Sequence, residues 1–163
     1  MKKVLLVRHA KSSWDAPGLP DMDRPLNERG KRDAPAMAER IRDKKIPIDA
    51  FVTSPAKRAK KTAAIFAKTY KVDREKIITK AELYGAGDAG FLDVISHMDD
   101  KYDCIAIFSH NPGLTDFANT LTENRIDNIP TSGVFAVQSD CKKWKDFEGS
   151  RTEFLFFDYP KAT

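Results

Sequence analysis

Side chains that could handle a phosphoryl group stand directly after apolar segments of the chain. Arg8 and His9 follow the run "VLLV", and His110 comes two residues after the run "CIAIF". Arg58 lies a few residues beyond a third apolar segment, "AFVT". Guanidinium groups match phosphate oxygens bidentately, and a neutral imidazole is a good nucleophile. These residue types predict the binding or transfer of a phosphoryl group.

Each of these residues alone would be weak support for a site. A single histidine at a strand end is more often structural than catalytic, and an arginine such as Arg58 is more often a solvated helix residue. Lys57, Lys60 and Lys61 are interpreted as such a solvated face, and His97 as a surface residue at a helix end. The coincidence of two histidines and two arginines is what indicates a site.

The sequence predicts no metal and no cofactor. It contains no H-x-H or H-E-x-x-H motif and no cysteine pair at ligand spacing. Arginines next to the candidate histidines would also repel a cation.

Short apolar segments alternate with longer stretches of helical periodicity. We expect strands at 4–7, 49–55, within 76–85, at 103–109, 132–140 and 153–159, with helices after each of the first four. This alternation is typical of βαβ units, and uninterrupted apolar runs indicate strands buried on both faces. The prediction is a three-layer α/β/α sandwich with a mainly parallel central sheet, as one domain over 1–163. The last two strands would add an antiparallel or mixed portion.

Proline and capping residues mark the expected helix starts. Pro35 should kink the first helix or lie near its true start. Ser54 can cap the second helix with Pro55 in its first position, and Asn111 and Pro112 repeat the pattern later. Ligands of open α/β sheets bind beyond the carboxyl ends of the strands, so the candidate side chains should meet at one rim.

Four segments of the chain, in order, resemble the histidine phosphatase superfamily, the phosphoglycerate mutase-like group. They are "RHAKSSWD", "RPLNERG", "SPAKRAKKTA" and "SHNPG". The short chain and the form of the motifs are similar to the SixA-type branch, the small phosphohistidine phosphatases. The resemblance spans roughly Val4 to Val137. Ala10 stands where the family commonly has glycine, and this R-H-A form also occurs in the SixA-type branch.

The resemblance implies a role for each of four residues. His9 matches the histidine that is phosphorylated during turnover. Arg8 and Arg58 match two phosphate-binding arginines. His110 matches the second histidine, which contacts the phosphoryl group and stabilises the transition state.

The proton donor that many family members use has a less certain match. Glu82 in "KAELYGAGD" stands at about the corresponding place, and the alternative is an ordinary exposed loop glutamate. Asp88 is a poorer candidate because it resembles the N-cap of the next helix. A phosphohistidine substrate leaves as an imidazole, which needs less acid catalysis than an alkoxide, so a weak acid would favour that substrate.

The leading hypothesis is a metal-independent phosphatase acting on phosphohistidine in proteins through a covalent intermediate. The alternatives are a phosphatase for a small phosphoester or sugar phosphate, and a non-catalytic phosphate-recognition module. Short segments between the motifs predict a shallow, open pocket suited to a protein substrate. Trp14 either contacts a partner or packs against its own loop.

Composition limits the partners and the cellular location that we expect for the protein. The 163 residues carry a formal net charge of +4, without a block of like charges or a known nucleic-acid module, so no nucleic-acid partner is expected. Two cysteines are too few for a disulfide framework. The apolar run before Arg8 is shorter than the roughly 7 residues of a secretory core or the about 20 of a membrane span. We expect a reduced, cytoplasmic monomer that does not bind membranes.

Overall fold

A six-stranded mixed sheet forms the centre of the protein, described here from a computed structural model for residues 1–161. The strands are β1 (Lys2–Arg8), β2 (Ala50–Thr53), β3 (Ile78–Thr79), β4 (Cys104–Ser109), β5 (Val134–Ser139) and β6 (Thr152–Asp158). Their order across the sheet is β3-β2-β4-β1-β5-β6. The first four are mutually parallel, and β5 runs antiparallel to both β1 and β6. The predicted parallel sheet with an antiparallel addition is confirmed.

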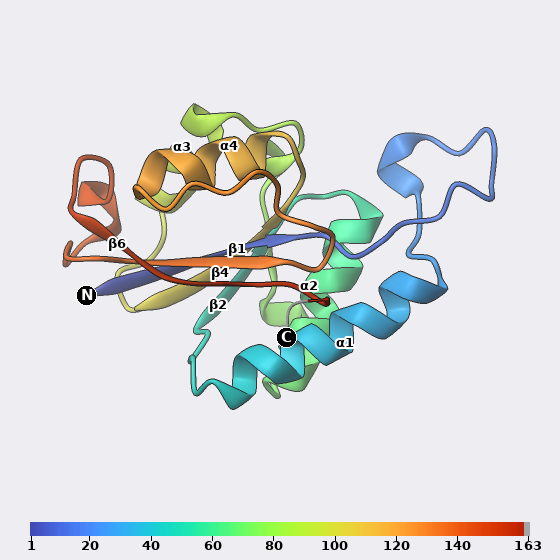
Figure 1. Cartoon of the computed structure of the whole chain (residues 1–163), viewed down its shortest axis with the longest axis horizontal. Coiled ribbons are helices and arrows are strands. Elements are labelled where there is room, and N and C mark those ends of the chain that lie inside the picture. Colours follow the sequence, from blue (N-terminus) through green and yellow to red (C-terminus); the bar gives the residue numbers. More distant parts are fainter. Residues whose placement is uncertain (162–163) are drawn as a thin grey trace.

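Helices cover both faces of this sheet, as the three-layer prediction requires. They are α1 (Glu28–Asp43), α2 (Lys57–Thr69), α3 (Asp88–Ser96) and α4 (Gly113–Leu121). Figure 1 shows α3 and α4 on one face and α1 and α2 on the other. Single 3-10 turns occur in the connections: η1 (Asp21–Asp23), η2 (Arg74–Lys76), η3 (Ala81–Leu83) and η4 (Trp144–Asp146). None of the helices described is long and apolar enough to cross a membrane.

The alternation of side chains along β1 builds two separate cores. Leu5 points to the α1 and α2 face, where it packs in a cluster with Phe66 of α2. Val4 points the other way, into a cluster that contains Phe91 of α3 and Phe117 of α4. The rings of Phe91 and Phe117 are stacked with centroids 5.0 Å apart. Since each buried aromatic or aliphatic side chain stabilises by about 1.5–3 kcal/mol, the two cores hold the sheet rigidly between the helices.

The first helix does not begin near Pro35. It starts at Glu28, where the Asn27 side chain caps it by accepting the N–H of Gly30 at 2.8 Å. The helix then continues through Pro35 to Asp43. The cap at Asn27 decides the start, so the alternative that placed the start near Pro35 is wrong.

Two other helices begin later than predicted. The Ser54 hydroxyl accepts the N–H of Ala56 rather than one from the helix, and Ala56 has an extended backbone, so α2 begins only at Lys57. Pro112 precedes α4 instead of occupying its first position. Both helices start shortly after the carboxyl end of a strand, α2 after β2 and α4 after β4. Two residues of the site described next, Ser54 and His110, lie in these two connections.

Candidate active site

The pairing of β1 with β4 brings the two candidate histidines together. Arg8, the last residue of β1, lies opposite Ser109, the last residue of β4. His9 and His110 are the next residues on the two strands, and the N–H of His9 donates to the carbonyl of Ser109 at 3.2 Å. The ring centroids of His9 and His110 lie 5.1 Å apart, with the planes tilted by 48°. The predicted convergence at one rim of the sheet is therefore observed for both histidines.

The hydrogen bonding of His9 leaves one ring nitrogen free. Its Nδ1 lies 2.8 Å from the carbonyl oxygen of Ala10. A carbonyl can only accept, so Nδ1 carries the proton and Nε2 keeps its lone pair. Burial above all, together with the nearby charges of His110, Arg58 and Arg8, lowers the pKa of His9 to about 3, although the hydrogen bond to Ala10 raises it. The ring is therefore neutral and nucleophilic near pH 7.

His110 is neutral as well and is oriented by a hydroxyl. Its Nε2 lies 2.7 Å from Oγ of Ser54, which also accepts the N–H of Ala56. Burial first, and then the charge of Arg58, lower the pKa of His110 to about 4. When the Ser54 hydroxyl donates to Nε2, the neutral ring carries its proton on Nδ1. That nitrogen is buried without a hydrogen-bond partner in the described structure, so its hydrogen-bonding capacity is unused there.

Among the described residues, both candidate arginines are hydrogen-bonded through their Nη atoms and not through Nε. Arg58, in the first turn of α2, is 5% exposed and donates through Nη1 to the Asp21 carbonyl at 2.7 Å and through Nη2 to Oδ2 of Asp21 at 2.9 Å. Arg8 donates through Nη1 to the carbonyl of Ile129 at 3.0 Å. The Nε of each guanidinium is buried and has no partner among the described residues. Each arginine is thus fixed in place with donor capacity left over.

Buried polar atoms without partners concentrate at this site. Within residues 1–161 there are five such side-chain atoms: Arg8 Nε, Arg24 Nη1, Arg58 Nε, His110 Nδ1 and Ser132 Oγ. A buried polar atom left unpaired costs about 1–3 kcal/mol, so folded proteins rarely keep several together without a reason. Three of the five belong to the arginines and the second histidine predicted to bind a phosphoryl group. Guanidinium and imidazole N–H groups are donors that suit an oxyanion.

Asp21 links the site together, and the sequence did not reveal it. Besides the Arg58 guanidinium, its carboxylate accepts the hydroxyl of Tyr84 at 2.6 Å and Nε of Arg24 at 3.1 Å. The bond from Tyr84, followed by those from the two arginines, holds the pKa of Asp21 well below its usual range. The Tyr84 ring meets His110 edge to face at 5.5 Å. One aspartate in an irregular loop gives no sequence signal for such a role.

Two further hydroxyl residues make hydrogen bonds to the segment 8–10. Thr62 accepts the N–H of Ala10 at 2.9 Å and donates to the carbonyl of Arg58 at 2.8 Å, which ties β1 to α2. In the sequence, the only indication of this role of Thr62 is its position four residues after Arg58, one turn along the same helix. Ser132, with a φ of 64°, directs its N–H to the carbonyls of Arg8 and His9 at 3.1 and 3.2 Å. Nothing in the sequence pattern pointed to Ser132.

Glu82 lies beside the site without joining its hydrogen bonds. It is part of η3, whose Leu83 carbonyl accepts the hydroxyl of Ser109 at 2.7 Å. The Glu82 side chain is exposed and makes no hydrogen bond or ion pair with any residue from 1 to 161. Asp88 is the first residue of α3, with Gly87 rather than Asp88 in the N-cap position.

Trp14 and His97 stand outside the hydrogen-bonded cluster. Trp14 is 74% exposed, and the Arg24 guanidinium stacks 3.5 Å from its ring centroid, so the ring contacts its own loop on one side and solvent on the other. His97 is exposed at the end of α3, with Nδ1 3.5 Å from a carboxylate oxygen of Asp93. In the part of the chain that is described, no group of three or more His, Cys, Asp or Glu could hold a metal ion.

Comparison with known proteins shows which families and structures the chain is similar to. A model of the histidine phosphatase superfamily (branch 1) matches residues 4–84, a span that contains Arg8, His9, Arg58 and Glu82 but not His110. An uncharacterized protein of Mycobacterium tuberculosis is 29% identical over 168 residues, covering 95% of this chain and all of that protein. The metal-independent phosphoserine phosphatase of Arabidopsis thaliana is 41% identical over 69 residues, which is 41% of this chain and 29% of that protein.

Solved structures extend the likeness over the whole chain. A SixA protein from Agrobacterium tumefaciens superposes with a TM-score of 0.82 at 26% identity, covering 98% of each chain. The protein histidine phosphatase SixA complexed with tungstate has a TM-score of 0.77 at 21% identity, with 97% of each chain covered. A mycobacterial glucosyl-3-phosphoglycerate phosphatase shares the fold, with a TM-score of 0.73 at 11% identity over the full length of both.

Proposed function

We propose, from the premise that this chain belongs to the histidine phosphatase superfamily, that it removes the phosphoryl group from phosphohistidine in a protein substrate without a metal. The observation that carries the proposal is the state of His9. Its ring is neutral, its Nδ1 proton is held by Ala10, and its Nε2 is left free beside two arginines and a second histidine.

In the first step, the Nε2 lone pair of His9 attacks phosphorus. The P–N bond to the substrate imidazole breaks, and its electron pair goes to the leaving nitrogen, which takes a proton from water or from Glu82. Charge spreads over the three equatorial oxygens of the transferring group. Arg8, Arg58 and His110 would donate to those oxygens through the atoms that lack protein partners.

In the second step, a water oxygen attacks the phosphorus of phosphorylated His9. The P–Nε2 bond breaks and returns its electron pair to the ring, and the proton of the water passes to solvent or to the Glu82 carboxylate. The products are inorganic phosphate and the neutral His9 from which the cycle began. Because Asp21, Thr62 and Ser132 hold the surrounding groups, little reorganisation is needed between the steps.

The surroundings of Glu82 support phosphohistidine as the substrate. This carboxylate is exposed and unattached, so nothing in the described structure fixes it for proton transfer. An alkoxide leaving group would need a well-placed acid, whereas an imidazole does not. The similarity to SixA over 98% of the chain points the same way.

A small phosphoester is the second candidate. The 69-residue match to a metal-independent phosphoserine phosphatase favours it, as does a shared fold with a glucosyl-3-phosphoglycerate phosphatase. A non-catalytic phosphate-recognition module is less well supported, since such a module has no need of an intact nucleophile at His9.

A substrate panel with Glu82→Gln separates the two substrate classes. Wild type, Glu82→Gln and a matched control, Glu75→Gln at another exposed site, are assayed on a phosphohistidine protein, a sugar phosphate and p-nitrophenyl phosphate. We expect the phosphohistidine protein to be the fastest substrate, with both variants within about threefold of wild type because the imidazole needs little acid catalysis. A sugar phosphate that is fastest in wild type and is no longer hydrolysed by Glu82→Gln would instead establish the second candidate.

Dialysis against EDTA tests the metal independence of the same reaction. In the proposed mechanism Arg8, Arg58 and His110 donate to the phosphoryl oxygens. We therefore expect the dialysed enzyme to hydrolyse the phosphohistidine protein at the same rate as the undialysed enzyme. A loss that added divalent cations restore would contradict the metal-independent mechanism.

A further inference from the structure

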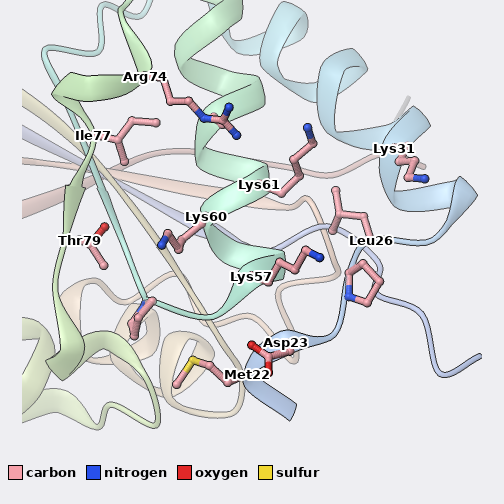
Figure 2. A pocket seen from close by; sticks show the side chains of 13 residues that line it. Met22, Asp23, Leu26, Lys31, Lys57, Lys60, Lys61, Arg74, Ile77 and Thr79 are labelled. Atoms are coloured by element: carbon pink, nitrogen blue, oxygen red, sulfur yellow. The ribbon is translucent and has the colours of Figure 1, made fainter. Parts of the chain in front are cut away.

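A cavity of about 680 Å³ lies between α2, the segment 22–26 and the short strand β3. Figure 2 shows cationic side chains around it that come from separate parts of the chain, among them Lys57, Lys60 and Lys61 of α2. The cations that line it are Lys31, Lys57, Lys60, Lys61 and Arg74, and the lining includes a single carboxylate, that of Asp23. Its charge is therefore strongly positive.

The protein does not neutralise these cations itself. Lys57, Lys60, Lys61 and Arg74 are exposed and form no ion pair with any residue in the described part of the chain. Lys31 approaches only the exposed Glu28, at 3.6 Å. Gathering like charges disfavours the folded state, because each cation raises the potential at the others. An anionic partner would remove that cost.

The rest of the lining favours a polypeptide among anionic partners. The remaining residues are mostly apolar: Met22, Pro25, Leu26, Pro55, Ala64 and Ile77, together with the polar Thr79. Apolar side chains offer nothing to a free phosphate ion, but they can bury the apolar side chains of a peptide. The lining has no aromatic residue, whereas single-stranded nucleic acids are usually held by stacking on aromatic rings.

Three residues that line the cavity are sequence neighbours of residues of the phosphoryl site. Lys57 directly precedes Arg58, and Pro55 directly follows Ser54, whose hydroxyl contacts His110. Met22 likewise follows Asp21, the residue that holds Arg58. A chain whose phosphorylated side chain reaches His9 could therefore continue into the cavity.

We propose that this basic cavity is a docking surface for an acidic segment, bearing apolar side chains, of the phosphorylated protein substrate. The inference rests on the proposed function, since it assigns the protein substrate a second point of contact. It adds to that function a dependence of kcat/KM on the residues that flank the phosphohistidine.

Charge reversal on α2 tests the docking surface. The variant combines Lys57→Glu, Lys60→Glu and Lys61→Glu, and a neutral version uses glutamine at the same positions in case reversal disturbs folding. Glutamate and glutamine are good helix formers, so the helix should be retained. The matched control combines Lys142→Glu, Lys143→Glu and Lys145→Glu, three exposed lysines that do not line the cavity.

Two synthetic phosphohistidine peptides serve as substrates, one flanked by Asp, Glu and Leu and the other by Ser, Asn and Leu. Each rate is divided by that on p-nitrophenyl phosphate to normalise the variants. We expect wild type and the control to prefer the acidic peptide by about tenfold in kcat/KM at low salt, through KM. Both α2 variants should lose the preference. Equal rates on the two peptides in wild type, or a preference that survives in both α2 variants, would overturn the proposal.

Direct binding separates this proposal from the proposed function. Fluorescence anisotropy measures a labelled, unphosphorylated acidic peptide, which we expect wild type to bind and the α2 variants not to bind. Binding without hydrolysis of either phosphopeptide would overturn the proposed function and leave the docking surface standing. Displacement by a single-stranded oligonucleotide at lower concentration than by unlabelled acidic peptide would overturn the docking proposal in favour of nucleic acid.

Discussion

The phosphoryl site and the basic cavity beside it use positive charge in opposite ways. Arg58 is 5% exposed and fixed by the two hydrogen bonds that it donates to Asp21, whereas Lys57, its neighbour in the same turn of α2, is exposed and forms no ion pair with the described residues. A buried, oriented guanidinium acts at short range, where the dielectric is low and screening is weak. Exposed ammonium groups act over a longer distance and are screened by salt. Under the functions proposed above, the buried arginines take part in the reaction, whereas the exposed lysines attract the substrate protein.

Replacing the nucleophile should have the largest effect on the buried region. We expect His9→Ala to lower kcat on p-nitrophenyl phosphate by at least about 10³-fold, because no other group can form the intermediate. Steady-state kinetics measures the loss, with circular dichroism to verify folding. His97→Ala, which removes the exposed histidine, is the control. Turnover of His9→Ala within tenfold of wild type would show that the reaction does not pass through this residue.

Removing a buried arginine should cost less than removing the nucleophile but more than removing an exposed cation. We expect Arg58→Ala to lower kcat/KM for p-nitrophenyl phosphate by about 10²–10³-fold, the usual loss for one oriented donor to the transition state. Lys68→Ala, at an exposed position of the same helix, should stay within about twofold. Equal effects of the two substitutions would erase the distinction between buried and exposed cations.

The lowered pKa of His9 should also appear in the stability of the fold. Burial lowers this pKa to about 3 in the folded protein, below the 6.5 of a free histidine, so the unfolded chain binds more protons. The contribution of His9 to stability is complete above pH 6.5 and declines as the pH falls towards 3. Between pH 7 and pH 5 we expect a loss of about 2 kcal/mol from this residue.

Urea unfolding of wild type and His9→Gln at both pH values measures that loss. Glutamine cannot titrate, so the decrease in the free energy of unfolding should be about 2 kcal/mol smaller in the variant. His97→Gln, at an exposed histidine outside the site, is the matched control. Parallel pH dependence in wild type and His9→Gln would mean that His9 is not held neutral by burial.

Loosening Arg58 without removing it should have the smallest effect. Asp21→Asn keeps the shape of the side chain but weakens the hold on Arg58 and Tyr84, so we expect kcat/KM for p-nitrophenyl phosphate to fall by about tenfold. Asp15→Asn, in the same loop, is the control. An increase in kcat/KM would show instead that Asp21 competes with the phosphoryl group for Arg58.

Much of the fold and the pair of histidines could be predicted because they follow from local patterns. Apolar runs located the strands, and parallel strands end at one rim, so His9 and His110 were expected to meet. The starts of α2 and α4 were misplaced, and at α2 the start depends on a local bond that composition does not reveal, the one that the N–H of Ala56 donates to the Ser54 hydroxyl. The Asp21 and Tyr84 contact depends on the path of two irregular loops, for which the sequence has no periodicity.

The basic cavity could not be predicted from the sequence either, although its lysines could be assigned to an exposed helix face. Lys57, Lys60 and Lys61 were interpreted as a solvated helix face, and their exposure agrees with that. Only the tertiary structure brings Arg74 and Lys31 to the same cavity. A helical pattern shows which face is polar, but it does not show which other segments face it.

Trapping the phosphorylated enzyme tests the central claim most directly. Wild type and His9→Ala are mixed with a ³²P-phosphohistidine protein, quenched in alkali within milliseconds to seconds, and digested for mass spectrometry. The account predicts a transient, acid-labile and alkali-stable label on His9 in wild type, and none in the variant. Release of inorganic phosphate by wild type without any label on His9 at any time point would contradict it.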